Sequence, residues 1–168
     1  MTAADEVAVR ERTYSWIDPQ TYVDAAHGRS GLELFRYLLD HDVPPPPIGQ
    51  TLGFRLVEVD KGLAIFAIDP AEHLYNPIGS VHGGVYATLL DSAAGVSVHT
   101  TLPAGVGYTS LDLAVKFLRP MTPDGGEARA IGTVIHSGRR TALAEAKMVD
   151  SKGRLLATAT SSCLILNP

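Results

Sequence analysis

One apolar segment constrains the fold more than any other feature of this sequence. Residues 83–99 read GGVYATLLDSAAGVSVH, and on a helix their apolar side chains occupy nearly the whole circumference, which is typical of a buried helix. A doubly wound parallel sheet needs a helix between each pair of strands, and only this helix lies among the strand-like runs. The sequence therefore predicts the α+β class, with an antiparallel sheet wrapped around one long central helix.

Six strand-like runs flank this helix in the sequence. They are residues 51–59, 62–69, 108–118, 127–136, 139–149 and 154–166. Turns such as Asp60-Lys61-Gly62 and Ser137-Gly138 are too short for a parallel crossover, so neighbouring strands should be antiparallel. The even positions of 142–148 and the odd positions of 157–163 are mostly small residues. Because alternate residues share one face of a sheet, this face should let the helix approach closely.

The chain before residue 48 has a different pattern. Apolar residues within 32–39 recur at helical spacing and indicate an amphipathic helix that ends near His41. Four consecutive prolines, Pro44 to Pro47, can neither continue a helix nor donate to a sheet, so they should form an extended joint. We therefore divide the chain into an N-terminal helical appendage at 1–47 and a main domain at 48–168.

The composition excludes several classes of protein. The length of 168 residues fits one domain, and 14 Lys and Arg against 18 Asp and Glu give a net charge of −4, so we expect no nucleic-acid partner. No stretch reaches the roughly 18 apolar residues of a membrane span, and the N-terminus lacks a signal-peptide core, so we expect a cytoplasmic protein without membrane contact. Cys163, the single cysteine, allows no internal disulfide, and the histidines lack zinc-hydrolase spacing, so we expect no metal site.

Two adjacent glycines, Gly83 and Gly84, begin the central helix. The first turn of a helix has unpaired N–H donors and a partial positive charge, and glycines leave those donors uncovered by side chains. A developing oxyanion could be stabilised there. The alternative is that the glycines only permit close packing of the helix on a strand.

A carboxylate, Asp91, lies in the middle of the same helix among apolar residues. A buried charge must be paired or have a raised pKa, so Asp91 is either a functional group or a structural one bonded to an arginine or to backbone donors. Asp91 follows His82 by nine positions, which places the two on opposite faces of the helix and roughly 13 Å apart. They cannot serve one reacting atom within one chain. Two antiparallel copies of the helix would bring the glycine end of one beside Asp91 of the other, so we expect a homodimer with a shared site.

Residues 76–93, NPIGSVHGGVYATLLDSA, resemble the signature of the PaaI-like hotdog-fold acyl-CoA thioesterases of the phenylacetate pathway. Further resemblance lies at 108–112, 117–120, 137–140 and 157–159. The resemblance implies the hotdog fold and the hydrolysis of an aromatic or fatty acyl-CoA to the free acid and coenzyme A. It also implies no cofactor beyond the coenzyme A of the substrate, and homodimers that pair into a homotetramer.

The resemblance implies roles for the residues at matching positions. Asp91 matches the carboxylate that acts as nucleophile or as general base for water, and Gly83 matches the backbone donor that polarises the thioester carbonyl. Asn76 matches a residue that helps to place the carbonyl or the water. His82 matches a residue that orients the glycine turn, and Ser110 a hydroxyl near the carboxylate of the partner subunit. From the residues alone, His82 is explained at least as well as a helix cap, and Ser110 as an ordinary sheet serine.

Coenzyme A carries three phosphates, so an acidic protein that binds it needs local positive charge at the mouth of its site. We assign this role to Arg119, Arg139 and Arg140, with Gly84 as a further contact to the substrate; the alternative for the arginines is solvated turn positions. A non-catalytic acyl-CoA sensor or carrier on the same fold is the alternative function, and it would not need a carboxylate at Asp91. A hydratase on this fold would need a different Asp/His motif, which this sequence lacks.

Overall fold

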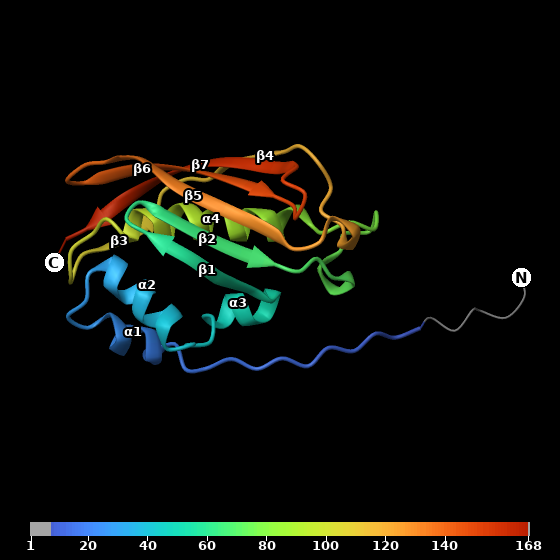
Figure 1. The fold of residues 1–168 in the computed structure, drawn as a ribbon, viewed down its shortest axis with the longest axis horizontal. Coiled ribbons are helices and arrows are strands. Elements are labelled where there is room, and N and C mark those ends of the chain that lie inside the picture. The colour runs from blue at the N-terminus through green and yellow to red at the C-terminus, as the bar shows by residue number, and fades with distance from the viewer. Residues whose placement is uncertain (1–7, 168) are drawn as a thin grey trace, which may run out of the picture.

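The computed structural model describes residues 8–167 and shows a seven-stranded antiparallel sheet folded around one long helix (Figure 1). The strands are β1 (Phe54–Asp60), β2 (Leu63–Ile68), β3 (Gly107–Ser110), β4 (Ala114–Phe117), β5 (Ala128–Ser137), β6 (Thr141–Val149) and β7 (Leu155–Leu166). Their order across the sheet is β1-β2-β5-β6-β7-β3, and β4 also pairs with β7. This arrangement confirms the predicted α+β class and the predicted wrapped sheet.

Four α-helices and two short 3-10 helices complete the described chain. They are α1 (Gln20–Ala26), α2 (Gly31–Asp40), α3 (Pro47–Leu52), α4 (Gly83–His99), η1 (Glu72–Leu74) and η2 (Pro123–Gly125). The central helix α4 has the predicted bounds, and ten of its 17 residues are buried. The remaining residues leave one side of α4 uncovered by the sheet, which matters for the site below.

The sheet approaches α4 most closely at a glycine in β5. A Cβ atom on Gly132 would lie 2.1 Å from the carbonyl oxygen of Ala93, so the two backbones are almost in contact. On β6, Ala144 and Ala146 also face the helix and are at most 3% exposed. The prediction of a small-residue face that admits a helix is confirmed.

The predicted strand 108–118 is wrong as a single strand. It is interrupted after Ser110, and pairing with β7 resumes at Ala114 with one extra residue on the β3–β4 side. The carboxylate of Asp112 accepts a hydrogen bond of 3.0 Å from the N–H of Ser162. A side chain thus takes the donor that a continuous ladder would pair with backbone, which is the geometry of a bulge.

The predicted start of the first strand at residue 51 is also wrong, because residues 47–52 form α3 instead. Pro47 opens this helix rather than ending an extended joint, since the first helical position requires no N–H donor. Gly53 ends it with a φ of 81°, a left-handed conformation that glycine adopts without strain. The proposed division of the chain at residue 47 stays a prediction.

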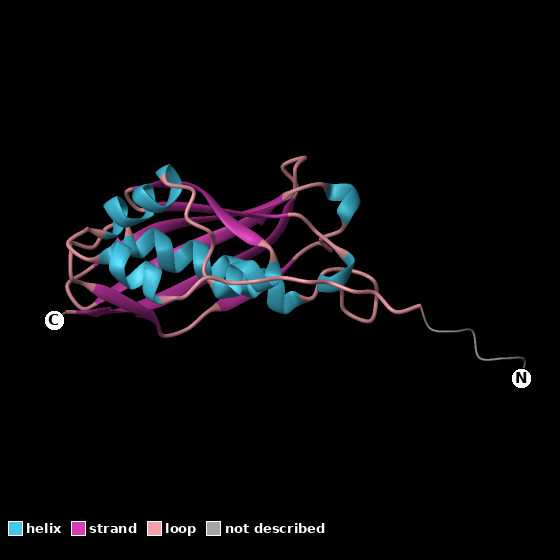
Figure 2. Ribbon diagram, turned by 90° about the horizontal axis from the view of Figure 1, so that it is seen from below, coloured by secondary structure: helices cyan, strands magenta, loops and turns pink. Residues whose placement is uncertain are grey.

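The predicted helix at 32–39 is confirmed as α2. Ser30 and Glu33 form a reciprocal capping box at its start, and the N–H of Gly31 donates a 3.1 Å hydrogen bond to the carbonyl of Leu102, just beyond α4. Seen from below, the N-terminal helices lie in front of the sheet (Figure 2), and α2 packs against β1 and α4. Residues 1–7 of the predicted appendage lie outside the described residues.

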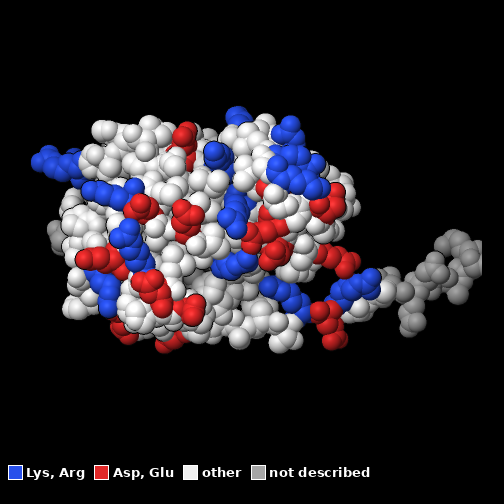
Figure 3. All heavy atoms as spheres, viewed as in Figure 1, with Lys and Arg blue, Asp and Glu red and all other residues white. Residues whose placement is uncertain are grey.

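The surface carries charges of both signs. On the face viewed in Figure 3, acidic and basic side chains are interspersed, and ion pairs such as Arg55 with Glu127 and Arg36 with Asp60 join them. Among residues 8–167, no helix combines the length and the apolar character needed to cross a membrane.

Candidate active site

The turn before α4 is braced by its own side chains. The side-chain oxygen of Asn76 accepts hydrogen bonds from the N–H groups of Ile78 at 3.0 Å and Ser80 at 3.4 Å, and its amide donates to Ser80 Oγ at 3.2 Å. This turn leads directly into the glycine pair. The structure thus places Asn76 as the brace of the turn, and the contact with a carbonyl or a water that the resemblance implied stays a prediction.

His82 caps α4. Its Nδ1 accepts a hydrogen bond of 2.9 Å from the N–H of Gly84, so the explanation of His82 as a helix cap is confirmed. The N–H of Gly83, one residue earlier, has no acceptor among residues 8–167. A free N–H at the positive end of a long helix is suited to hold a developing negative charge.

Gly83 is also closely covered by an aromatic ring. A Cβ atom on Gly83 would lie 3.2 Å from Cζ of Phe117, at the end of β4. Phe117 in turn makes an edge contact with Tyr86, with ring centroids 5.7 Å apart. The explanation of the glycine as a site of close packing is therefore confirmed, and its role as a donor to an oxyanion stays a prediction.

Asp91 lies on the uncovered side of α4 and is half-buried, so the prediction of poor solvent access holds only in part for the single chain. Its Oδ1 accepts a hydrogen bond of 2.9 Å from Ser110 Oγ at the end of β3. The resemblance implied that Ser110 lies near the carboxylate of the partner subunit. Within one chain the fold brings Ser110 to its own Asp91, and proximity to the partner's carboxylate stays a prediction.

Tyr108 lies flat against α4 one helical turn beyond Asp91. A Cβ atom on Gly95 would lie 2.5 Å from the Tyr108 hydroxyl oxygen, so only glycine lets this ring reach the helix. Burial raises the pKa of Tyr108, and the charge of Asp91 raises it further. Sequence reasoning missed this residue, although a glycine inside an otherwise strong helical pattern indicates a close neighbour.

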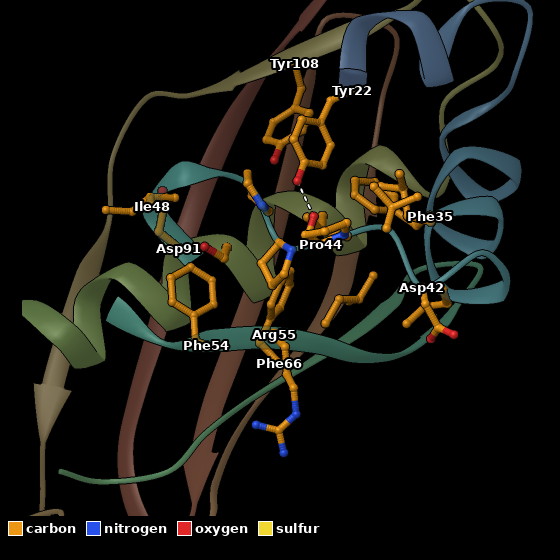
Figure 4. Close-up of a pocket in the computed structure, with 18 residues that line it drawn as sticks. Tyr22, Phe35, Asp42, Pro44, Ile48, Phe54, Arg55, Phe66, Asp91 and Tyr108 are labelled. Atoms are coloured by element: carbon orange, nitrogen blue, oxygen red, sulfur yellow. Dashed lines mark hydrogen bonds between the residues drawn. The ribbon is translucent and has the colours of Figure 1, made fainter. Parts of the chain in front are cut away.

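A pocket of about 420 Å³ lies beside Asp91 and is lined by Tyr108, by β1 and β2, and by the N-terminal segment (Figure 4). A second hollow of about 310 Å³ lies at the other half of the site and is lined by Gly83, Asn76, Phe117 and Arg119 among others. The chain therefore has an apolar pocket at the carboxylate and an open groove at the glycine turn.

The two halves of the site are separated along α4. Gly83 precedes Asp91 by eight residues, which corresponds to about 12 Å of helix and a rotation of about 80°. Ser110 of β3 contacts Asp91, and Phe117 of β4 contacts Gly83. Both halves of the site therefore lie at the same edge of the sheet. One chain alone cannot bring them to one substrate atom.

The three arginines are not brought together in one chain. Arg119 borders the groove at Gly83, and its Nη1 donates a 2.7 Å hydrogen bond to the carbonyl of Leu155. Arg139 and Arg140 lie in the β5–β6 turn, where Ser137 reaches Thr101 just beyond the C-terminal end of α4. Their assignment to the nucleotide of coenzyme A stays a prediction.

The remaining reactive groups do not form a second centre within the described part of the chain. Cys163 is buried, and burial raises the pKa of its thiol, as expected for a packed side chain. No cluster of three or more His, Cys, Asp or Glu side chains in residues 8–167 is placed to hold a metal ion.

Comparison with known proteins gives the family. The sequence model of the thioesterase superfamily matches residues 78–157, which include α4 and its glycine turn. A phenylacetic acid degradation-related protein of Ralstonia eutropha JMP134 has 30% sequence identity, and the match covers 77% of this chain and 98% of that one with a TM-score of 0.69. This chain belongs to the thioesterase superfamily.

Two further proteins are similar to this chain, one in sequence and one in fold. The 1,4-dihydroxy-2-naphthoyl-CoA hydrolase of Listeria monocytogenes is 28% identical over 107 residues, which are 64% of this chain and 85% of the relative. The PaaI protein of the E. coli phenylacetic acid degradation operon has 20% identity and a TM-score of 0.68, covering 80% of this chain and 94% of its own, and supports the fold alone. The chain is thus a hotdog-fold thioester hydrolase, as the sequence predicted.

Proposed function

We propose that this thioesterase hydrolyses an aromatic or fatty acyl-CoA to the free acid and coenzyme A, with Asp91 of one subunit and Gly83 of the other acting on the same thioester. One observation carries the proposal. Ser110 orients Asp91 at the mouth of an apolar pocket, while Gly83, whose N–H is free within the described chain, lies two helical turns away against Phe117 of the same sheet edge.

A two-fold axis beside Ala87 would complete the site. Ala87 is the midpoint between positions 83 and 91, so an antiparallel copy of α4 would place the partner's Gly83 opposite Asp91. The uncovered side of α4 suits such a contact because its residues are small: Gly84, Ala87, Thr88, Asp91 and Ser92. The hydroxyls of Thr88 and Ser92 are already bonded to helix carbonyls at 2.9 and 2.8 Å, so two helices can approach without losing hydrogen bonds.

The neighbouring sheet edge supports the same dimer. β3 ends the sheet, and an unpaired edge is a template for another chain. Leu111, Phe117 and Leu118 on this edge are more than half exposed, which is costly for a chain that stays alone. We expect these dimers to pair into tetramers and to work in the cytoplasm.

In the proposed reaction, Asp91 acts on the thioester carbonyl carbon. As a general base it takes a proton from a water molecule, whose oxygen attacks the carbon; as a nucleophile its own carboxylate oxygen attacks the carbon. In both cases the carbonyl oxygen becomes an oxyanion that accepts a hydrogen bond from the N–H of the partner's Gly83. The C–S bond then breaks, and the sulfur of coenzyme A leaves with the electron pair and takes up a proton, which in the general-base route is the one held by Asp91. In the nucleophilic route this step leaves an acyl anhydride on Asp91, which water then hydrolyses to the free acid.

Other predicted residues have supporting roles in this proposal. Asn76 and His82 hold the glycine turn, and Gly84 presents backbone to the substrate beside it. Ser110 occupies one carboxylate oxygen of Asp91 and leaves the other for the reaction. Arg119 borders the groove at the glycine turn, and we assign it, with Arg139 and Arg140 at the hairpin, to the phosphates of coenzyme A.

Asp91→Asn tests the catalytic role. The substitution keeps the size of the side chain and removes its charge, so we expect kcat to fall by at least roughly 100-fold while a non-hydrolysable acyl-CoA analogue binds with little change. The release of coenzyme A is followed with a thiol reagent. Asp112→Asn is the matched control, because Asp112 lies on the same sheet edge outside the site.

Two results would contradict the assignment. Near wild-type kcat for Asp91→Asn would exclude Asp91 from the chemistry, and a lowered melting temperature with normal turnover would make it a structural carboxylate. If the wild-type protein binds acyl-CoA but releases no coenzyme A from any substrate, the non-catalytic carrier is correct.

Hybrid dimers test the shared site. A mixture of Asp91→Asn with Gly83→Val contains hybrids in which one of the two sites is intact, so with random exchange about a quarter of the wild-type activity should return. Mass spectrometry confirms that subunits exchange. Complete exchange without recovered activity would mean that both groups act within one chain.

A further inference from the structure

The pocket beside Asp91 has two walls of different origin. One wall is formed by the main domain, where Asp91 and Val96 of α4 face Phe54 and Phe66 of the sheet (Figure 4). The other is formed by the N-terminal segment, which supplies nine of the 18 lining residues between positions 22 and 46. The appendage therefore covers the pocket that adjoins the reactive carboxylate.

The chemistry of these walls excludes the coenzyme A end of the substrate. Asp42 and Asp91 bring negative charge to the pocket, and Arg55 is the only basic side chain among residues 8–167 that lines it. Arg55 is already paired with Glu127 at 2.5 Å and with Asp69 at 3.3 Å. A nucleotide with three phosphates would be repelled here. An apolar acyl group would instead be buried favourably against the aromatic and aliphatic walls.

The outer wall is fixed in place by several contacts. The Tyr22 hydroxyl donates a hydrogen bond to the carbonyl of Pro44, which joins α1 to the proline segment. Gln50 of α3 donates to the carbonyl of Pro45 at 2.5 Å. At the other end, a Cβ atom on Gly31 would lie 1.9 Å from the carbonyl oxygen of His99, so α2 sits directly on the end of α4. The wall is built into the fold.

We infer that residues 22–46 select the acyl group, with Leu38, Leu39 and Val43 setting the depth of the pocket and Tyr22 holding Pro44 in place. This inference rests on the proposed function, because it needs the thioester carbonyl at Asp91. The appendage then takes no part in bond breaking, but it determines which acyl groups bind with their carbonyl in reach of the carboxylate.

Filling the pocket from this wall should shorten the acyl groups that are accepted. Each buried methylene contributes about fourfold to binding, so a Leu39→Trp substitution that displaces two or three methylenes should weaken long substrates about 15-fold to 60-fold. Leu39→Ala should have the opposite effect and favour longer groups.

The experiment compares these variants with Leu32→Trp, a matched substitution on the same helix at a residue that does not line the pocket. Saturated acyl-CoA substrates from two to twelve carbons and aryl acyl-CoA substrates are assayed for kcat and KM. Thioether analogues of the same acyl groups are titrated by calorimetry, which measures selection without hydrolysis. We expect the length profile to shift in KM and in affinity for Leu39→Trp and Leu39→Ala, whereas Leu32→Trp should keep the wild-type profile.

Tyr22→Phe, with Tyr37→Phe on α2 as its control, tests the bond to Pro44 and covers the case in which Leu39→Trp fails to fold. Loss of one hydrogen bond should lower the affinity for long acyl groups about twofold to tenfold. The inference is overturned if the Leu39 variants and Tyr22→Phe all keep the wild-type length profile. It is also overturned if Leu32→Trp shifts the profile as much as Leu39→Trp. Failure of the proposed function is seen separately, as full turnover in Asp91→Asn.

Discussion

Gly132 gives the sharpest test of how the sheet holds the catalytic helix. A Cβ atom on this residue would lie 2.1 Å from the carbonyl oxygen of Ala93 and 2.7 Å from the backbone nitrogen of Ala94. Non-bonded carbon atoms settle at about 3.5–4.0 Å, so Gly132→Ala requires α4 to move from β5 by about 1 Å or more. Both sides of the contact are backbone, so no side-chain rotation relieves it.

The expected cost follows from two opposing terms. Overpacking costs about 1–3 kcal/mol, and an alanine recovers about 0.4–1 kcal/mol because it restricts the unfolded chain. We expect the free energy of unfolding to fall by about 2 kcal/mol, because a backbone clash lies at the upper end of the first range. For a chain of this size the melting temperature should fall by about 4–8 °C. Asp91 lies two residues from Ala93, so kcat should fall with it.

Urea unfolding at one fixed protein concentration measures this effect, because a dimer's stability depends on its concentration. Gly107→Ala is the matched control, since it also lies in a strand but meets only Leu166 Cβ at 4.0 Å. Its stability should stay within about 0.5 kcal/mol of wild type. The reasoning is refuted if Gly132→Ala unfolds at the wild-type urea midpoint, or if Gly107→Ala loses as much stability.

Three further outcomes follow from particular contacts. Ser30→Ala removes the cap of α2 and should lower the free energy of unfolding by about 1 kcal/mol in urea unfolding, whereas Ser30→Thr should not. Ser110→Ala should lower kcat without lowering the affinity for a non-hydrolysable acyl-CoA, because it frees the carboxylate of Asp91 to turn; unchanged kcat would make Ser110 an ordinary sheet serine. Burial alone would raise the pKa of Asp150, but hydrogen bonds from Arg154 and neighbouring N–H groups hold it below the usual value. Asp150 therefore stabilises the fold above about pH 4 and loses that contribution as the pH falls further, and Asp150→Asn should flatten this acid dependence of the urea midpoint.

Local patterns in the sequence predict the parts of the fold that depend on local structure. The continuous apolar pattern of 83–99 gave both ends of α4, and the short turns gave the antiparallel pairing of β5, β6 and β7. The split between β3 and β4 was not predictable in this way. It depends on a bond from the Ser162 N–H to Asp112, and these residues are far apart in the sequence.

In the candidate site, too, local features were predictable from the sequence and contacts between distant residues were not. A carboxylate in an apolar helix is visible in the sequence, and so is a glycine pair at a helix start. That Ser110 bonds to Asp91 of its own chain depends on where β3 ends, and that Tyr108 rests on Gly95 depends on a contact across the core. The outer wall of the pocket was not predictable for another reason. The sequence pattern of residues 22–46 indicates a helix and a proline segment, but it does not indicate which part of the main domain they pack against.

Gly83 and Asp91 are joined by one rigid helix. The number of residues between them is therefore more constrained than the identity of those residues. A single residue inserted between them would turn Asp91 by about 100° and shift it by about 1.5 Å, away from Ser110 and, in the proposed dimer, away from the partner's Gly83. The two-fold arrangement would impose this error twice, once at each site. The segment 83–91 should therefore tolerate substitutions far better than insertions or deletions.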